Sequence, residues 1–351
     1  MESIGQLLQL IPYYGLLPDF LRAFMPAIVS AVALFAVLAL FVLYLVWMER
    51  KVSAHMQDRL GPMYVGGWHG WAQTIADALK LLLKEDIVPA ETDRVLYKMA
   101  PFIVFLGAFA AFVVIPFGAG SIVSDLNIGV LYVVAIGSLS VVGIIMAGWS
   151  SNSKYSLYGG MRSVAQIVSY EIPAAISIMT VVILVGSLSM QDIVNAQAGG
   201  IQNWFLFRNP FTFLAFFIYF IASLAEVNRT PFDIPEAESE LVAGYHTEYS
   251  GMRFAFFFLA EYANMIVVAG VATTLFLGGW TQVLPASWAP QLIPGPVMFI
   301  AKVLFVIFLQ MWLRWSLPRL RVDQLMYMCW KVLLPASLML VLGVGWLAVY
   351  W

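Results

Sequence analysis

The sequence predicts an all-α, polytopic integral membrane protein with about eight transmembrane helices and an amphipathic surface helix in its first cytoplasmic loop. Apolar residues make up 62% of the 351 residues and charged residues only 11%, against roughly 45–50% and about 25% in ordinary globular domains. The mean hydropathy is +0.87, which leaves too little polar surface to cover a water-soluble fold. Lipid is therefore expected to surround most of this chain.

A transmembrane helix needs about 20 largely apolar residues, because a helix pairs its backbone polar groups without water. Eight runs meet this requirement, at about 26–48, 99–118, 130–150, 166–186, 211–227, 254–277, 297–317 and 328–350. Residues 4–24, interrupted by Pro12 and Pro18, are expected on the membrane surface, and no basic segment precedes them as in a cleaved signal peptide. No repeat or linker divides the chain, so residues 1–351 are interpreted as a single polytopic domain.

The basic residues predict the orientation of these spans. The loops after the first, third, fifth and seventh spans hold 14 Lys and Arg, whereas the opposite side holds only Arg22 and Arg208. By the positive-inside rule, the basic loops are cytoplasmic and both termini lie outside.

Several function classes are excluded. The net charge of −2 gives no basic excess for nucleic acid. The single cysteine, Cys329, excludes a disulfide framework and a cysteine-held iron–sulfur cluster. The three histidines lie outside the spans and no nucleotide-binding glycine motif occurs. We therefore expect no metal, cofactor or catalytic redox centre in this chain, and any electrons must come from another subunit.

The first cytoplasmic loop, residues 49–98, contains the predicted surface helix. Its polar face is formed by Gln73, Asp77, Lys80 and Lys84, and the opposite face by Trp71, Ile75, Leu79 and Leu82. Such a helix directs its basic stripe toward headgroups or a partner, and a simple topological anchor is the alternative.

Carboxylates are concentrated around the third cytoplasmic loop. Between Ala225 and Arg253 the acids are Glu226, Asp233, Glu236, Glu238, Glu240 and Glu248, opposed only by Arg229 and Arg253. The acids at 236, 238 and 240 are so close that each is expected to raise the pKa of its neighbours toward the range of proton exchange near pH 7.

Two further acids lie inside predicted spans. Glu171 and Glu261 are each expected about 13 Å from the cytoplasmic face at 1.5 Å per residue, and Glu226 near the inner end of its helix, so the three should converge on one layer. Intramembrane acids are functional candidates by default. The alternative is structural, with Glu226 paired to Arg229 and Glu171 to Arg162.

Two other residues inside the spans have simpler interpretations. Pro173 should free the carbonyl of Ser169 to hold a water, and Lys302 should reach toward the outer surface.

These patterns fit either a secondary ion transporter or a membrane subunit of a proton-moving redox complex. A transporter would be marked by inverted repeats with interrupted helices, and the sequence contains none.

Two segments carry recognisable motifs. The first comprises Glu49-Arg50-Lys51-Val52, Gln57-x-Arg59-x-Gly61-Pro62, Gln73-x-x-Ala76-Asp77-x-x-Lys80 and Lys84-Glu85. The second runs from Ala225 to Leu241 and continues through Gly244-Tyr245-His246 and Glu248-Tyr249-Ser250-Gly251. Both segments resemble the family of membrane-embedded H subunits of proton-translocating NADH:quinone oxidoreductase, respiratory complex I. With the number of spans and the topology, the resemblance covers nearly the whole chain.

The resemblance implies a subunit that helps to enclose a quinone chamber and couples quinone reduction to proton translocation. In matching positions, the proton path comprises Glu171, Glu226, Glu236, Glu238 and Glu261, with Glu240 and Glu248 nearby. The chamber and partner interface comprise Arg50, Arg59, Asp77, Lys80, Arg229 and Asp233. Met63-Tyr64 stand where the family commonly has Asn-Arg, so no basic contact is expected there.

The resemblance also implies the partners and the location. FMN and iron–sulfur clusters are expected in other subunits, among them the hydrophilic quinone-site subunits and the terminal iron–sulfur subunit. Small membrane subunits and antiporter-like subunits are the expected neighbours in the bacterial inner membrane. A related ferredoxin-driven or hydrogenase-linked complex fits the sequence as well.

Overall fold

The computed structural model describes residues 18–234, 241–283 and 293–350 and confirms the all-α fold. The long helices are α2 (Asp19–Met56), α4 (Arg94–Ala111), α5 (Gly129–Gly137) continued by α6 (Leu139–Ser150), α7 (Lys154–Val185), α10 (Pro210–Glu226), α12 (Gly251–Phe276), α13 (Gly295–Ser316), and α14 (Val322–Tyr327) continued into α15 (Leu334–Tyr350). Seven candidate spans among these residues are long and apolar enough to cross a membrane. The shorter apolar helix α10 corresponds to the one remaining predicted span, 211–227. Within the described ranges no β-strand forms.

Several helices extend beyond their apolar runs. α2 ends at Met56 rather than near residue 48, and α7 begins at Lys154 rather than near residue 166. Glu171 therefore lies 17 residues after the start of its helix, about 26 Å along the axis. The expected distance of about 13 Å is counted from the start of the apolar run, so it is shorter than the distance from the start of the helix. A hydropathy pattern identifies only the apolar part of a helix. The first turns of α7 are polar and pack against other parts of the chain, so the pattern does not include them.

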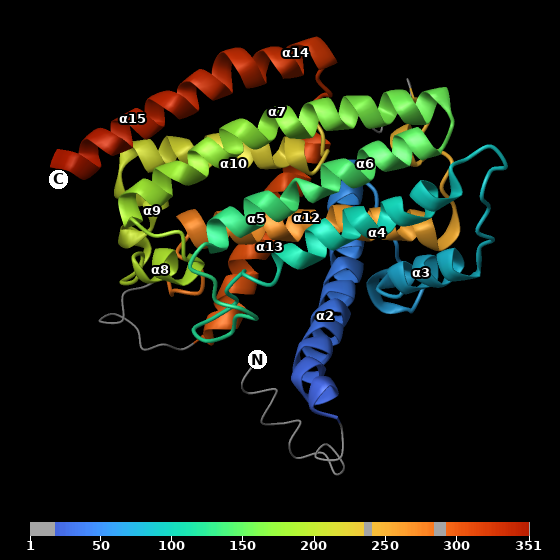
Figure 1. Ribbon diagram of the computed structural model, residues 1–351, viewed down its shortest axis with the longest axis horizontal. Helices are drawn as coiled ribbons and strands as arrows, with labels where there is room; N and C mark the ends of the chain where they lie inside the picture. Colours follow the sequence, from blue (N-terminus) through green and yellow to red (C-terminus); the bar gives the residue numbers. More distant parts are fainter. Residues whose placement is uncertain (1–17, 235–240, 284–292, 351) are drawn as a thin grey trace.

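The helices form one bundle with α12 near its centre. In Figure 1, α4, α6, α7 and α10 run alongside one another, α15 covers α7, and α2 crosses them steeply. α12 packs against α4, α13, α10 and α2, and all its residues from Met265 to Phe276 are buried. A helix enclosed in this way can carry polar side chains into the interior.

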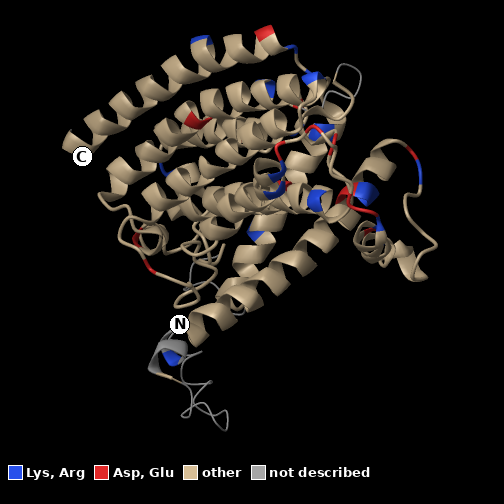
Figure 2. Ribbon diagram, turned by 45° about the vertical axis from the view of Figure 1, so that its right-hand side comes forward, with Lys and Arg blue, Asp and Glu red and all other residues tan. Residues whose placement is uncertain are grey.

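Charged residues gather at one end of the bundle, as Figure 2 shows. This end contains the 3-10 helix Gly244–His246 and α3 (Gln73–Leu83), which is the predicted surface helix. Lys84 follows α3 in extended conformation, so the predicted polar stripe is one residue too long. The apolar side chains Ile75, Leu79 and Leu82 are exposed on the isolated chain.

The expectation that Lys302 reaches the outer surface is wrong. Its side chain is only 8% exposed, and its Nζ donates to the carbonyls of Leu277, Gly279 and Thr281 at 2.7, 2.9 and 2.7 Å. The ammonium also lies 4.1 Å from the ring centroid of Trp204. Lys302 thus satisfies the carbonyls just beyond the end of α12, where the helix dipole also favours a cation.

The carbonyl of Ser169 also has a protein partner. Pro173 does remove its helical donor, but the buried thiol of Cys329 donates to this oxygen across 3.0 Å. Cys329 belongs to a π-helical segment, Met328–Leu333, between α14 and α15. The segment lies just before Pro335, whose missing amide hydrogen interrupts the normal helical ladder.

Candidate functional site

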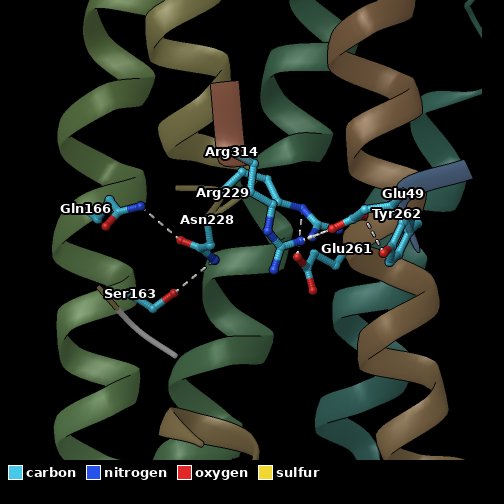
Figure 3. Close-up of polar contacts among 8 residues, drawn as sticks. All are labelled: Glu49, Ser163, Gln166, Asn228, Arg229, Glu261, Tyr262 and Arg314. Atoms are coloured by element: carbon cyan, nitrogen blue, oxygen red, sulfur yellow. Dashed lines mark hydrogen bonds and ion pairs between the residues drawn. The ribbon is translucent and has the colours of Figure 1, made fainter. Parts of the chain in front are cut away.

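A buried ion cluster lies at the charged end of the bundle, formed by Glu49, Arg229, Glu261 and Arg314 (Figure 3). Arg229 Nη1 donates to Glu49 Oε1 across 3.2 Å, and Arg229 Nε lies 3.1 Å from Glu261 Oε1. Arg314 forms an ion pair with the same Glu49 oxygen. Tyr262 donates its hydroxyl to the other Glu49 oxygen at 2.6 Å. Two cations and two anions therefore balance one another, largely shielded from bulk water.

The cluster joins four parts of the chain. Glu49 comes from α2, Glu261 and Tyr262 from α12, Arg314 from α13, and Arg229 from the turn after α10. Burial lowers the pKa of the Arg229 guanidinium, but the carboxylates of Glu261 and Glu49 outweigh it and raise that pKa. Arg229 stays charged and ties α2 to α12.

The turn that carries Arg229 is held by α7. Gln166 Nε2 donates to the carbonyl of Ala225 at 2.8 Å and to Asn228 Oδ1 at 3.1 Å (Figure 3). Asn228 adopts the left-handed conformation, with φ of 51°, which asparagine tolerates better than most residues. The position of Arg229 is therefore fixed by α7 and by local turn chemistry.

A cavity of about 510 Å³ opens beside the ion cluster. Its charged wall comprises Glu49, Arg50, Arg59, Arg229, Glu261 and Arg314. Its aromatic wall comprises Tyr245, His246, Phe254, Phe257, Phe258, Tyr262 and Trp315. This volume is typical of a site for a drug-sized ligand, and a ring-lined wall facing a charged wall suits a ligand that is partly apolar and partly polar. We call it the chamber.

A second cavity of about 40 Å³, called the interior cavity below, is lined by residues of α5, α7, α10 and α12. Glu171 of α7 and Glu226 of α10 both line it, together with Tyr219 and Asn264. The expected convergence of three intramembrane carboxylates is therefore divided. Glu171 and Glu226 share the interior cavity, while Glu261 faces the chamber.

The alternative of structural ion pairs does not hold for Glu171 and Glu226. Arg229 is paired with Glu49 and Glu261 rather than with Glu226. Among the described residues neither Glu171 nor Glu226 forms an ion pair. Both carboxyls thus lack the partner that a purely structural role would require.

Other predicted residues lie nearer the surface. Asp77 pairs with Arg50 at 2.6 Å, and Asp233 with Arg319 at 2.9 Å. Lys80 is exposed. The backbone carbonyl of Glu248 accepts a hydrogen bond from the Tyr97 hydroxyl at 2.7 Å. Glu236, Glu238 and Glu240 lie outside the described residues.

The loop at Glu248 is anchored by an aromatic pair. Tyr249 stacks on Tyr97 with ring centroids 4.1 Å apart and donates to the Tyr97 carbonyl at 3.2 Å. Burial raises the pKa of Tyr249 to about 12, so this hydroxyl keeps its proton at neutral pH.

Sequence reasoning misses Glu49, Tyr262, Arg314 and Asn264 as site residues. Glu49 follows the predicted end of the first span, which suggests a surface cap, whereas α2 continues past it. In the sequence, Arg314 is counted only among the basic residues that predict the orientation of the spans. A signal is present at Asn264, a polar residue three positions after Glu261 in an apolar run.

Comparisons with known proteins agree with this architecture. A family model described as NADH dehydrogenase matches residues 29–345. The chain is 58% identical to the H subunit of NADH-quinone oxidoreductase of Chlorobaculum tepidum over 320 residues, which is 89% of each chain.

More distant organisms give similar matches. The first of the numbered H subunits of Geobacter sulfurreducens is 49% identical over 91% of this chain and 93% of that protein. The H subunit of Bacteroides thetaiotaomicron is 48% identical over 92% and 91%. The family model matches most of the chain, and about half of the residues are identical to those of the H subunits. The chain therefore belongs to the NADH dehydrogenase family, as a multi-pass membrane subunit of the NADH-quinone oxidoreductase type.

Proposed function

We propose that this subunit forms the membrane wall of a quinone chamber and couples quinone reduction to proton translocation through its buried carboxyls. The observation that carries the proposal is the pair of cavities along α12, one lined by Glu261 and the ion cluster, the other by Glu171 and Glu226. The chamber offers aromatic faces for a quinone ring and charged donors for its oxygens.

The proposed chemistry assigns the electrons to partner subunits. A hydrophilic subunit with the terminal iron–sulfur cluster delivers two electrons to the quinone, and FMN and the other clusters belong to further partners. Two protons must then reach the reduced quinone oxygens to give the quinol. Glu261, one of the two acids that line the chamber, is placed to respond to that demand.

The proposed route continues into the membrane. Loss or gain of a proton at Glu261 changes the electric field at Glu226 and Glu171, and these two carboxyls exchange protons in response. The resulting change in charge then acts on small membrane subunits and antiporter-like subunits. We place the complex in the bacterial inner membrane, with both termini of this chain outside. The orientation follows from the positive-inside rule, because the charged end of the bundle in Figure 2, where most Lys and Arg lie, should face the cytoplasm.

Substitution of the two acids in the assembled complex tests the proposal. Glu226→Gln and Glu261→Gln remove the titratable group and keep its shape, so both should lower quinone reduction and proton pumping in proteoliposomes supplied with NADH and quinone. Asp125→Asn is the matched control, because Asp125 is exposed in the loop before α5 and lines neither cavity. Normal reduction and pumping in both Glu variants would overturn the proposed role.

A further inference from the structure

The turn that follows α12 lies at the end of the bundle opposite the ion cluster. Lys302, which binds the carbonyls of this turn, precedes Arg314 by 12 residues of α13, or about 18 Å along the helix axis. Gly278 and Gly279 form the turn, with φ of 71° and 52°. A Cβ atom at Gly278 would lie 2.5 Å from Trp204 Nε1. Glycine therefore allows the backbone to pass Trp204 and to direct its carbonyls toward the ammonium.

The polar side chains around this turn are satisfied by protein atoms. The hydroxyls of Thr273 and Thr274 donate to carbonyls one turn back in α12. Gln197 is fully buried, and its amide forms hydrogen bonds with four backbone groups, those of Ile193, Phe205, Thr274 and Gly278. Trp204 Nε1 has no partner among the described residues, but an indole nitrogen is only a donor and offers no acceptor to a proton. These side chains need no water to complete their hydrogen bonds.

Lys302 is held at this turn as a charged ammonium. Its Nζ has three carbonyl acceptors at 2.7, 2.9 and 2.7 Å, and only the protonated amine has three hydrogens to donate. The ring face of Trp204 and the negative end of the α12 dipole also favour a cation. Within the described ranges Lys302 forms no ion pair with a carboxylate. Unlike the balanced ion cluster, this end of the bundle thus carries an uncompensated positive charge.

The hydrogen bonds to the turn do not by themselves require a charge. A hydroxyl, an amide or a buried water would also satisfy carbonyls, and each of these is far easier to remove from bulk water than an unpaired ammonium is. Lys302 is moreover the only charged residue between Glu261 and Arg314 in the sequence. The charge itself therefore needs an explanation.

The interior cavity lies between the chamber and this turn along α12. Val271 is the last residue of α12 that lines the cavity. Leu277, whose carbonyl accepts from the ammonium, is six residues further on, or about 9 Å along the axis. Glu171 and Glu226 line the same cavity and can hold protons. The stretch from Val271 to Leu277 therefore separates those protons from the solution at this end.

We propose that Lys302 is an electrostatic barrier, whose charge keeps protons and other cations from passing between the interior cavity and the solution at this end of the bundle. A hydrated proton that moves beyond Val271 approaches a fixed positive charge. At about 9 Å and an effective dielectric constant of about 20, one unit charge lowers the local concentration of another cation by roughly twentyfold. Fixed positive charges exclude cations and protons from membrane pores in the same way.

The carbonyls of the turn do not cancel this effect. A carbonyl dipole has no net charge, so its field falls off with distance faster than the field of the ammonium. The three carbonyls thus hold the cation in place while its repulsion still reaches the cavity. This inference goes beyond the proposed function, because it holds whatever reaction drives protons into the cavity.

The first test removes the charge and keeps hydrogen-bond donors. Lys302→Gln in the assembled complex leaves an amide to donate to the carbonyls, and Lys302→Arg keeps both charge and donors. The complexes are placed in liposomes with a trapped pH dye, and a pH step is applied without NADH or quinone, with valinomycin and potassium to carry the compensating charge. Proton permeability should rise by about tenfold in Lys302→Gln and stay normal in Lys302→Arg. Lys331→Gln is the matched control, because Lys331 is exposed.

The second test cancels the charge and leaves Lys302 in place. The carbonyl of Thr281 lies 2.7 Å from Nζ, so Thr281→Asp puts a carboxylate beside the ammonium, and Thr281→Asn is a neutral control of nearly the same shape. Proton permeability should rise in the Asp variant and not in the Asn variant, while the new ion pair keeps or raises the thermal midpoint of the complex. A purely structural role of Lys302 would produce no leak in either. These variants also carry the test if Lys302→Gln fails to assemble.

Chloride permeability separates a barrier from a packing defect. Loss of a positive charge admits cations but not anions, whereas a gap in the packing admits both. The chloride permeability of Lys302→Gln, measured with a trapped chloride-sensitive dye, should therefore stay normal while its proton permeability rises.

The inference is overturned if Lys302→Gln and Thr281→Asp both stay tight to protons. It is also overturned if Lys302→Arg leaks as much as Lys302→Gln, or if chloride leaks together with protons. None of these measurements requires turnover, so their outcome is independent of the proposed function. The proposed function fails instead if Glu226→Gln and Glu261→Gln pump normally.

Discussion

Tyr262 donates its hydroxyl to Glu49 across 2.6 Å, and this contact joins the neighbour of Glu261 on α12 to the C-terminal part of α2. Glu49 in turn receives Arg229 and Arg314 on its other oxygen. One carboxylate therefore holds together α2, α12, α13 and the turn after α10, which are the main walls of the chamber.

Glu49→Gln should destabilise the chamber strongly. The substitution leaves Arg229 and Arg314 facing an uncharged amide in a buried setting, and breaking a buried ion pair on one side typically costs about 3–5 kcal/mol. We expect a lower thermal midpoint of the assembled complex and weaker quinone reduction. Tyr262→Phe removes one hydrogen bond but no charge, so it should have a clearly smaller effect. Equal effects of the two variants would contradict the central role of the Glu49 charge.

Lys302→Met should destabilise the packing around the end of α12. The change deprives the carbonyls of Leu277, Gly279 and Thr281 of their donor, and each unsatisfied buried acceptor costs about 1–3 kcal/mol. Thermal unfolding of the purified complex measures the loss. Lys331→Met is the control, because Lys331 is exposed beside Tyr327. Comparable stability of both variants would show that the Lys302 contacts contribute little.

Asp77→Asn should leave the stability almost unchanged. The Arg50–Asp77 pair is short, but its side chains are 42% and 36% exposed, and such pairs contribute about 0–1 kcal/mol. The thermal midpoint should move little, and the difference from the unmodified complex should shrink further in high salt. A large destabilisation would mean that this pair is covered in the complex.

Gly159→Ala should displace the segment that carries Tyr245 and His246. A methyl group at Gly159 would lie 2.6 Å from backbone atoms of Gly244 and 2.7 Å from the Tyr245 nitrogen, so the chamber wall has to move. We expect the quinone KM to rise by roughly tenfold, equivalent to about 1.4 kcal/mol, with a smaller change in kcat.

Gly345→Ala provides the control for Gly159→Ala, because nothing lies within 4 Å of a methyl group at Gly345. Similar KM values in the two variants would show that the close approach of α7 to Gly244 does not shape the chamber.

The sequence predicts the helices of this fold well because lipid requires long apolar runs, and each predicted span overlaps a helix. The second span is predicted too long, because α4 ends at Ala111 and not near residue 118. The bounds are less predictable. The apolar run alone leaves Glu49 outside the first span because its polar neighbours end that run, whereas packing against α12 and α13 keeps α2 helical to Met56.

Partners across the bundle could not be predicted from spacing. Arg229 is three residues from Glu226, which suggests a local pair, yet the turn at Asn228 directs Arg229 toward Glu49 and Glu261. Cys329 likewise reaches Ser169 from a different helix. Such contacts depend on tertiary packing, and a hydropathy pattern contains no information about them.

The shared cavity of Glu171 and Glu226 has an electrical consequence. α7 and α10 pack side by side, so a proton that passes between these carboxyls moves from one helix to the next rather than along either. A membrane potential acts along the bilayer normal, and a full crossing changes the energy of one charge by about 2.3 kcal/mol per 100 mV. A step between neighbouring helices crosses only a small part of that field, so its rate should depend little on how strongly the membrane is energised.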